Sequence, residues 1–192
     1  MRALLKKRTL VISFVLIVNF TFCVNLFASQ KAVISNVQLT NTRDDLIVYF
    51  KVENAFTDEI SQAVLKGVPA SFSFSVKLDQ KKNSFFDTEI SDYKMTSTLK
   101  YNILKKEFSV YRSWKHEKPV VTNSFKEAKK LMTEIDNLTI TNIANLVKGK
   151  QYELELKADL DKVTLPLYLH YIFFFVSFWN FETDKHVTKF IY

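Results

Sequence analysis

Alternation of apolar and polar residues is the main pattern of the chain beyond residue 30, and it predicts β-strands. The alternation is most regular in ASFSFSVKLDQ, where apolar side chains at every second position share one face of the strand. Strands buried on one face and solvated on the other are typical of antiparallel sheets. Strands are predicted at 32–39, 46–52, 70–80, 95–101, 108–111, 152–160 and 187–191.

Two segments between the strands carry the start and stop signals of short helices. The first has an N-cap at Thr57, acids in its first turn, and Gly67 at its end. The second begins with Ser124 and Glu127, which are spaced as a capping box, and its apolar residues keep helical spacing as far as Ile135. Both helices are interpreted as covers for a sheet.

The predicted fold follows from the order of these segments. The chain contains no internal repeat and no Gly/Ser/Pro-rich linker, and Leu78–Tyr93 is predicted to be a long exposed loop. The fold class is mainly β or α+β. An antiparallel sheet or β-sandwich is expected, decorated by two or three short helices and preceded by an N-terminal signal helix.

The first 29 residues have the layout of a secretory signal peptide. The basic MRALLKKR precedes an uncharged apolar run, and small residues follow, with cleavage predicted near Ala28 or Ser29. Leu26 stands where a small residue is preferred, and the run approaches the ~20 residues that span a bilayer. Residues 1–29 are therefore a signal peptide or an uncleaved membrane anchor. In both cases residues 30–192 are expected to form one exported β-rich domain, periplasmic or anchored to the outer face of the inner membrane, because the positive end stays inside.

The net charge and the cysteine content narrow the list of partners. The formal charge is +7, but four of the 27 basic residues lie within the first eight positions, and the remaining 23 face 20 acids. No basic stripe or nucleic-acid-binding motif is present, so no nucleic-acid partner is predicted. Cys23, the single cysteine, lies in the signal region. The exported domain is therefore expected to have no disulfide.

Catalytic and metal-binding patterns are sparse. The histidines, His116, His170 and His186, lack metal-ligand spacing, and neither HExxH nor GxSxG occurs. Paired acids fall in turns or at helix starts, where capping explains them. Arg112, Trp114 and His116 alternate at a strand end, a pattern more typical of an edge-strand surface than of a ligand-facing row. No catalytic, cofactor-binding or metal-binding residue is predicted, and no cofactor is expected.

The stretch Leu165–Phe181 contains one histidine and no fixed charge, and three interpretations of it stay open. A membrane span is disfavoured, because the stretch falls short of ~20 residues and contains Pro166. A buried core element is favoured by continuous apolar character. The third interpretation is an aromatic surface that docks on a membrane or a protein. Its candidate interaction residues are Tyr171, Phe174, Phe178, Trp179 and Phe181, with Glu182 as polar rim.

The order of motifs resembles one bacterial family. FTDEISQAVLKGVP at 56–69 and the later LPL…FWNFET are the most specific pieces, and the resemblance extends from about Val33 to Asp184. The chain is similar to the exported proteins grouped as domain of unknown function 4390. Asn180 stands where the family often carries an acid. Because that family has no established activity, the resemblance implies an envelope location and a fold but supplies no catalytic residues.

Three functions are carried forward. The favoured one is a non-enzymatic binding or structural module of the cell envelope that contacts an unidentified protein or lipid partner, with membrane-surface contact included, through the aromatic segment. The first alternative is an extracytoplasmic sensor or regulator that works with a membrane kinase. The second is a hydrolase of envelope polymers, which would require two convergent carboxylates roughly 5–10 Å apart in a pocket.

Overall fold

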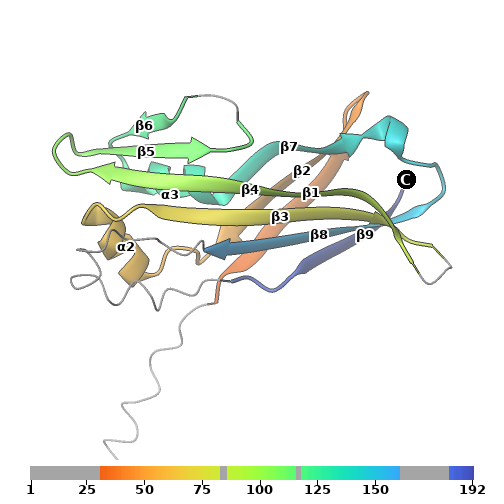
Figure 1. Ribbon diagram of the computed structural model, residues 1–192, viewed down its shortest axis with the longest axis horizontal. Coiled ribbons are helices and arrows are strands. Elements are labelled where there is room, and N and C mark those ends of the chain that lie inside the picture. The colour runs from red at the N-terminus through yellow and green to blue at the C-terminus, as the bar shows by residue number, and fades with distance from the viewer. Residues whose placement is uncertain (1–30, 83–85, 116–117, 161–181) are drawn as a thin grey trace, which may run out of the picture. The chain divides into compact units, whose positions relative to one another are not determined.

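Antiparallel strands make up most of the described chain (Figure 1). The computed structural model describes residues 31–82, 86–115, 118–160 and 182–192, all within the compact unit Lys31–Tyr192. The strands are β1 (Val33–Asn41), β2 (Asp45–Glu53), β3 (Ala70–Gln80), β4 (Thr88–Asn102), β5 (Glu107–Arg112), β6 (Val120–Thr122), β7 (Glu134–Asn142), β8 (Gln151–Leu160) and β9 (His186–Ile191). The helices are α2 (Asp58–Leu65) and α3 (Phe125–Thr133), with a 3-10 turn, η2 (Ile143–Asn145).

The strands form two sheets. One sheet has the order β1-β2-β7, and the other has the order β6-β5-β4-β3-β8-β9, with every pairing antiparallel. β7 therefore leaves its sequence neighbours and joins β2, while β8 joins β3. The prediction of a mainly β, antiparallel fold with short helices is confirmed.

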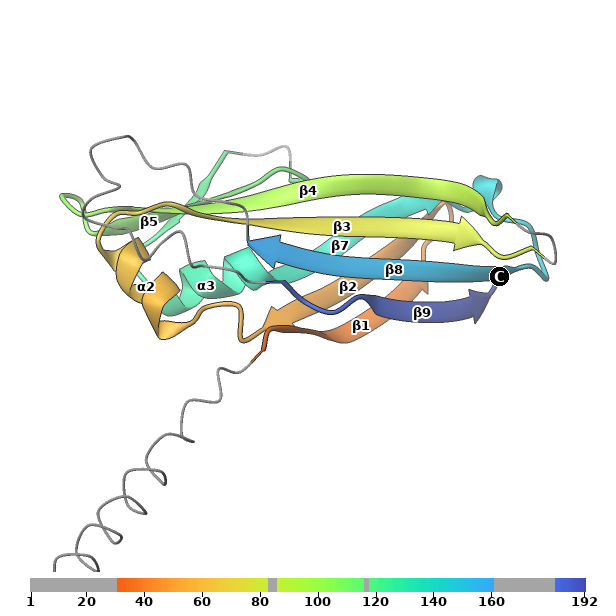
Figure 2. The same cartoon turned by 60° about the horizontal axis from the view of Figure 1, so that its bottom comes forward.

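The core lies between the two sheets and under the helices (Figure 2). The inward side chains of β3 and β8, at alternate positions, are buried as the sequence pattern predicts. Phe50 of β2 meets Phe74 of β3 edge to face, with ring centroids 6.1 Å apart, and so joins the sheets. At one end of the core, Phe72 packs against Phe56, which precedes α2.

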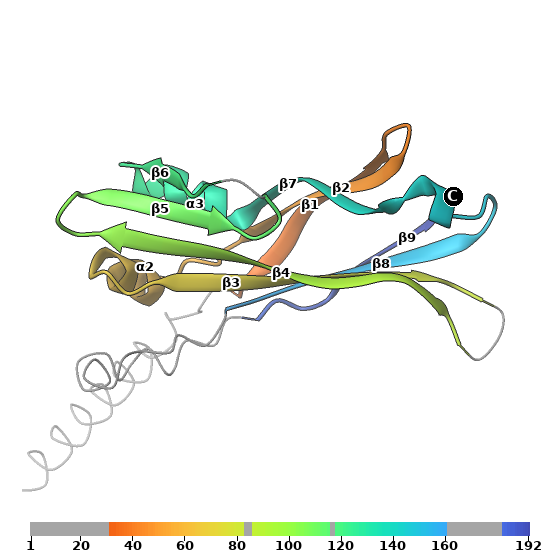
Figure 3. The same cartoon turned by 45° about the horizontal axis from the view of Figure 1, so that its top comes forward.

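The structure of α3 confirms the predicted N-cap at Ser124 but differs from the predicted capping box and helix length. The Ser124 hydroxyl accepts from the Glu127 N–H, but the Glu127 carboxylate accepts from the Thr122 hydroxyl rather than from the Ser124 backbone, so the capping box is not reciprocal. The helix ends at Thr133 and the chain enters β7 directly, so the extension of the helix to Ile135 was wrong. Ile135 is buried, as the helical spacing also predicted, but it is a strand residue that pairs with Phe50 of β2. Figure 3 shows α3 beside β5, against which it packs.

The prediction of a long loop over Leu78–Tyr93 was also wrong. β3 continues to Gln80, and β4 begins at Thr88, which is the register partner of Gln80. The chain between these strands is therefore a short connection at 81–87. The error arose because this part of the hairpin extends past the core. Its side chains are mostly polar on both faces, so the alternation fades although the strand continues.

Tyr93 links the two sheets, and we expect it to make stability fall at high pH. Its hydroxyl donates to the Thr139 carbonyl of β7 over 2.7 Å, and burial raises the pKa of Tyr93 to about 12. The unfolded value is about 10. Its contribution is therefore complete below pH 10 and is lost as the pH rises through 12. Allowing for partial exposure, the loss is on the order of 1 kcal/mol. Urea unfolding at pH 9 and 11.5 should show a steeper decline for the wild type than for Tyr93→Phe; equal declines would contradict the assignment.

No helix among the described residues has the length and apolar content needed to span a bilayer. The N-terminal residues 1–29 and the stretch Leu165–Phe181, which carry the sequence-based predictions about membranes, lie outside the described residues.

Candidate functional site

Most of the residues predicted from sequence as sites lie outside the part of the chain that the structure describes. This holds for the predicted cleavage residues and for the five aromatic candidates: Ala28, Ser29, Tyr171, Phe174, Phe178, Trp179 and Phe181. Glu182 is described. It forms an ion pair with Lys157, and the hydrogen bond from Lys157 lowers the pKa of Glu182. The backbone of Glu182 forms an isolated antiparallel β-bridge with Asp159 of β8.

The chain on the two sides of residues 161–181 is joined by backbone and side-chain contacts. The Ala158 N–H donates to the Thr183 hydroxyl over 3.0 Å, and the Thr183 N–H donates to the Ala158 carbonyl over 2.9 Å. Thr183 is buried. Lys31, the first described residue, forms a 2.7 Å ion pair with Asp184. The points where the described chain connects to residues 1–30 and to residues 161–181 therefore lie close together.

The predicted row of Arg112, Trp114 and His116 does not form a ligand-facing surface in the described chain. Trp114 packs perpendicular to Phe74, with ring centroids 5.8 Å apart, and so contributes to the core. Arg112 lies near Asp136, and His116 lies outside the described residues.

Acids and lysines alternate on the outer face of the six-stranded sheet. Lys77 contacts Asp79 at 3.2 Å and Glu89 at 3.6 Å, and Lys81 contacts Glu153 at 3.4 Å. These partly exposed pairs keep the face soluble and add little to stability. A hydrogen bond from Lys81 lowers the pKa of Asp87, which is opposite to the shift that a general acid needs.

Two acids, Glu127 and Glu134, line a pocket of about 460 Å³ beside α3 together with four lysines. Its carboxylates already have structural partners: Glu127 accepts from Thr122, and Glu134 lies 3.6 Å from Lys130. Both carboxylates of this pocket therefore have structural roles. Among the described residues, no group of three or more His, Cys, Asp or Glu side chains could hold a metal ion.

The turn between β4 and β5 presents apolar side chains to solvent. The side-chain oxygen of Asn102 accepts from the N–H groups of Leu104 and Lys105, both at 3.1 Å, and Lys106 adopts φ 57° to close the turn. Asn favours such local turns because its short side chain can bond the backbone two residues on. Leu104 is consequently 95% exposed and Ile103 is 55% exposed.

The end of α2 lies against this turn. The Val68 N–H bonds to the Ala63 carbonyl and the Gly67 N–H to the Val64 carbonyl, which is the Schellman arrangement. This ending requires the left-handed φ of +87° at Gly67. A Cβ there would also lie only 3.1 Å from Cδ1 of Ile103. Glycine thus allows α2 to approach the β4–β5 turn closely.

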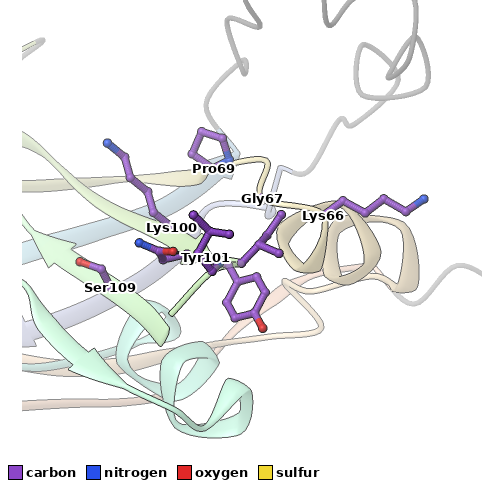
Figure 4. Close-up of a pocket in the computed structure, with 9 residues that line it drawn as sticks. Lys66, Gly67, Pro69, Lys100, Tyr101 and Ser109 are labelled. Carbon is purple, nitrogen blue, oxygen red and sulfur yellow. Dashed lines mark hydrogen bonds between the residues drawn. The ribbon is translucent and has the colours of Figure 1, made fainter. Parts of the chain in front are cut away.

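A surface pocket of about 580 Å³ lies between the end of α2 and the turn (Figure 4). Its lining includes Lys66, Gly67, Pro69, Lys100, Tyr101 and Ser109, together with both exposed apolar residues of the turn. In Figure 4, Lys66 and Lys100 extend away from the pocket in different directions. We call the exposed residues here the tip surface: Lys66, Lys100, Ile103, Leu104, Lys105 and Lys106.

The end of β8, where residues 161–181 begin, lies toward the same end of the six-stranded sheet as the tip surface. Leu160, the last residue of β8, is the register partner of Phe72, and Ala70 is the partner of Leu99 just before the turn. The opposite end holds the β3–β4 connection and the C-terminus (Figures 1 and 2). We call the end with the tip surface the α2 end.

Sequence reasoning missed the tip surface, although a signal was present. NILKKE places two large aliphatic residues between strands, where a turn would ordinarily be polar. Periodicity alone did not show whether Ile103 and Leu104 were the last core residues of a strand or an exposed pair.

The sequence profile of the family described as domain of unknown function (DUF4390) matches residues 29–189. The chain belongs to this family, as the resemblance of its motifs indicated. Searches of the curated proteins and of the solved structures gave no match.

Proposed function

We propose that this member of a family without an assigned activity is exported to the cell envelope. There it acts as a non-enzymatic docking module whose α2 end faces a membrane. The observation that carries the proposal is the tip surface, where exposed Ile103 and Leu104 stand among lysines. Exposed apolar residues in a polar rim are typical of interaction sites.

Lys31 follows a segment with the composition of a signal or anchor, and it pairs with Asp184. Asp184 adjoins Thr183, whose partner Ala158 lies opposite Phe74 in the middle of β3. A retained anchor would tether the folded unit to the bilayer, and the tip surface would then determine which end faces it. If the signal is cleaved, the tip surface would supply the attachment instead. The aromatic stretch Leu165–Phe181, whose partner contact is inferred from its sequence alone, follows Leu160 in the chain.

Site-specific crosslinking in cells tests the proposal. A photoreactive amino acid would replace Leu104 in the full chain, and matched cells would carry it at Lys148, which is exposed at the opposite end. Cells would be fractionated before and after irradiation. We expect recovery from the envelope and crosslinks to a membrane component from position 104 only. A cytoplasmic protein, or equal crosslinking from the two positions, would contradict the proposal.

The full chain should also be compared with a form that lacks residues 1–28 and is secreted by a substitute signal. The second form is expected to reach the same compartment and to wash off membranes with mild detergent. A crosslink from position 104 to a membrane kinase would instead favour the sensor or regulator alternative.

A further inference from the structure

We propose that the partner of the tip surface is an anionic lipid bilayer, with Ile103 and Leu104 inserted at the headgroup boundary and the lysines bound to lipid phosphates. The inference deepens the proposed function and rests on it for the location of the site in the cell.

The apolar part is shaped for shallow insertion. Leu104 is almost fully exposed, and Asn102 holds the turn in a fixed shape through two hydrogen bonds. A fixed turn loses little conformational entropy when it is ordered on a surface. Apolar side chains gain free energy when they leave water for the headgroup and acyl boundary.

The charges around the turn complement an anionic surface. None of Lys66, Lys100, Lys105 and Lys106 forms an ion pair with a carboxylate in the described chain. Glu107 is the nearby acid, opposite Asn102 in the sheet register. Basic residues beside an anionic leaflet each add to binding.

The opposite end of the sheet provides an internal comparison. Phe86 is also highly exposed there, but Lys81 beside it contacts Asp87 at 2.6 Å and Glu153 at 3.4 Å. The same end also carries exposed Val147 and Ile191 and three lysines without an ion pair in the described chain, Lys82, Lys148 and Lys150. The tip surface differs in that Ile103 and Leu104 line one pocket together with Lys66 and Lys100.

The composition favours a bilayer over a protein partner. Protein interfaces are enriched in aromatic residues and arginine and depleted in lysine, and they need roughly 800 Å² from each partner. The tip surface has two aliphatic residues and four lysines, from the β4–β5 turn, the end of β4 and the end of α2. The pocket of about 580 Å³ between Lys66 and Lys100 has room for a headgroup, with the Ser109 side chain also in its lining.

The full chain reconstituted into nanodiscs tests the inference. In a Cys23→Ser background, Leu104→Cys would carry an environment-sensitive fluorophore, and a matched protein would carry it at Lys148→Cys. We expect a blue shift at position 104 in discs that contain phosphatidylglycerol, a much smaller shift in phosphatidylcholine discs, and none at position 148. Equal shifts in both lipids, or no shift at position 104, would overturn the proposal.

Two triple variants with the same net charge separate the site from general electrostatics. Lys100→Gln, Lys105→Gln and Lys106→Gln together should weaken docking in anionic discs about 100-fold, since each lysine near an anionic surface contributes about fivefold. Lys82→Gln, Lys148→Gln and Lys150→Gln, at the opposite end, should leave docking within about threefold of the parent. Equal weakening in the two variants would overturn the proposal.

Failure of the lipid inference is distinguishable from failure of the proposed function. Docking in anionic discs without an envelope location in cells would refute the function and leave the lipid preference. Crosslinks to a membrane protein from position 104, with no lipid preference in discs, would refute the lipid inference alone.

Discussion

Phe74→Ala is expected to lower the free energy of unfolding by about 3–5 kcal/mol, the range for large aromatic deletions in a packed core. Phe74 is fully buried in β3, and its ring contacts Phe50 of the other sheet and Trp114 beyond β5. Truncation would leave a cavity between the sheets. Because domains of this size are stable by about 5–15 kcal/mol, the variant should lose a large part of its stability.

Urea unfolding followed by circular dichroism would measure this loss. Phe86→Ala is the matched control: the same substitution at a phenylalanine that is 84% exposed should change the free energy by no more than about 0.5 kcal/mol. A loss below about 1 kcal/mol for Phe74→Ala would contradict the packing of the three rings. The m-value should be the same in all three proteins if the variants unfold in one transition.

Local sequence patterns correctly predicted β3, β8 and the limits of α2. β3 and β8 have the clearest alternation in the chain and lie side by side at the centre of the larger sheet. Thr57 and Gly67 marked the limits of α2 because caps depend on a few adjacent backbone groups. Elements of this kind are determined by residues close in sequence.

The errors occurred where tertiary pairing decides the outcome. The helix prediction continued past Thr133 because Ile135 fits helical spacing, yet Glu134–Asn142 pairs with β2 as a strand. The three residues of β6 were too few to show a period, and they form a strand by pairing with β5. No local pattern could reveal that β7 belongs to the three-stranded sheet, since sheet membership depends on long-range contacts.

The sequence-based prediction of an interaction surface fell on Leu165–Phe181, which lies outside the described residues and stays a prediction. The sequence could not show that Lys66 and Lys100, 34 positions apart in the chain, flank one pocket. Their proximity depends on the close approach of α2 to the β4–β5 turn at Gly67.

Thr183→Val should destabilise the folded unit by about 2 kcal/mol. The Thr183 hydroxyl is the acceptor for the Ala158 N–H in a buried position, and valine has the same shape but no acceptor. A buried donor without a partner costs about 1–3 kcal/mol. Thr183→Ser keeps the oxygen and should retain most of the stability, whereas Thr40→Val, at an exposed position in β1, should change it by less than about 0.5 kcal/mol.

Urea unfolding and amide exchange at Ala158 would measure this contact, and its presence bears on the membrane interpretation of Leu165–Phe181. A single crossing of the hydrocarbon would place the two ends of such a stretch about 30 Å apart. Ala158 and Thr183 are instead joined by two hydrogen bonds, and Asp159 and Glu182 form an isolated antiparallel β-bridge. Faster exchange at Ala158 in Thr183→Val, with slow exchange in Thr183→Ser, would show that the folded unit keeps both ends on the same side of any membrane. Unchanged exchange in the valine variant would remove this constraint and reopen the single-span interpretation.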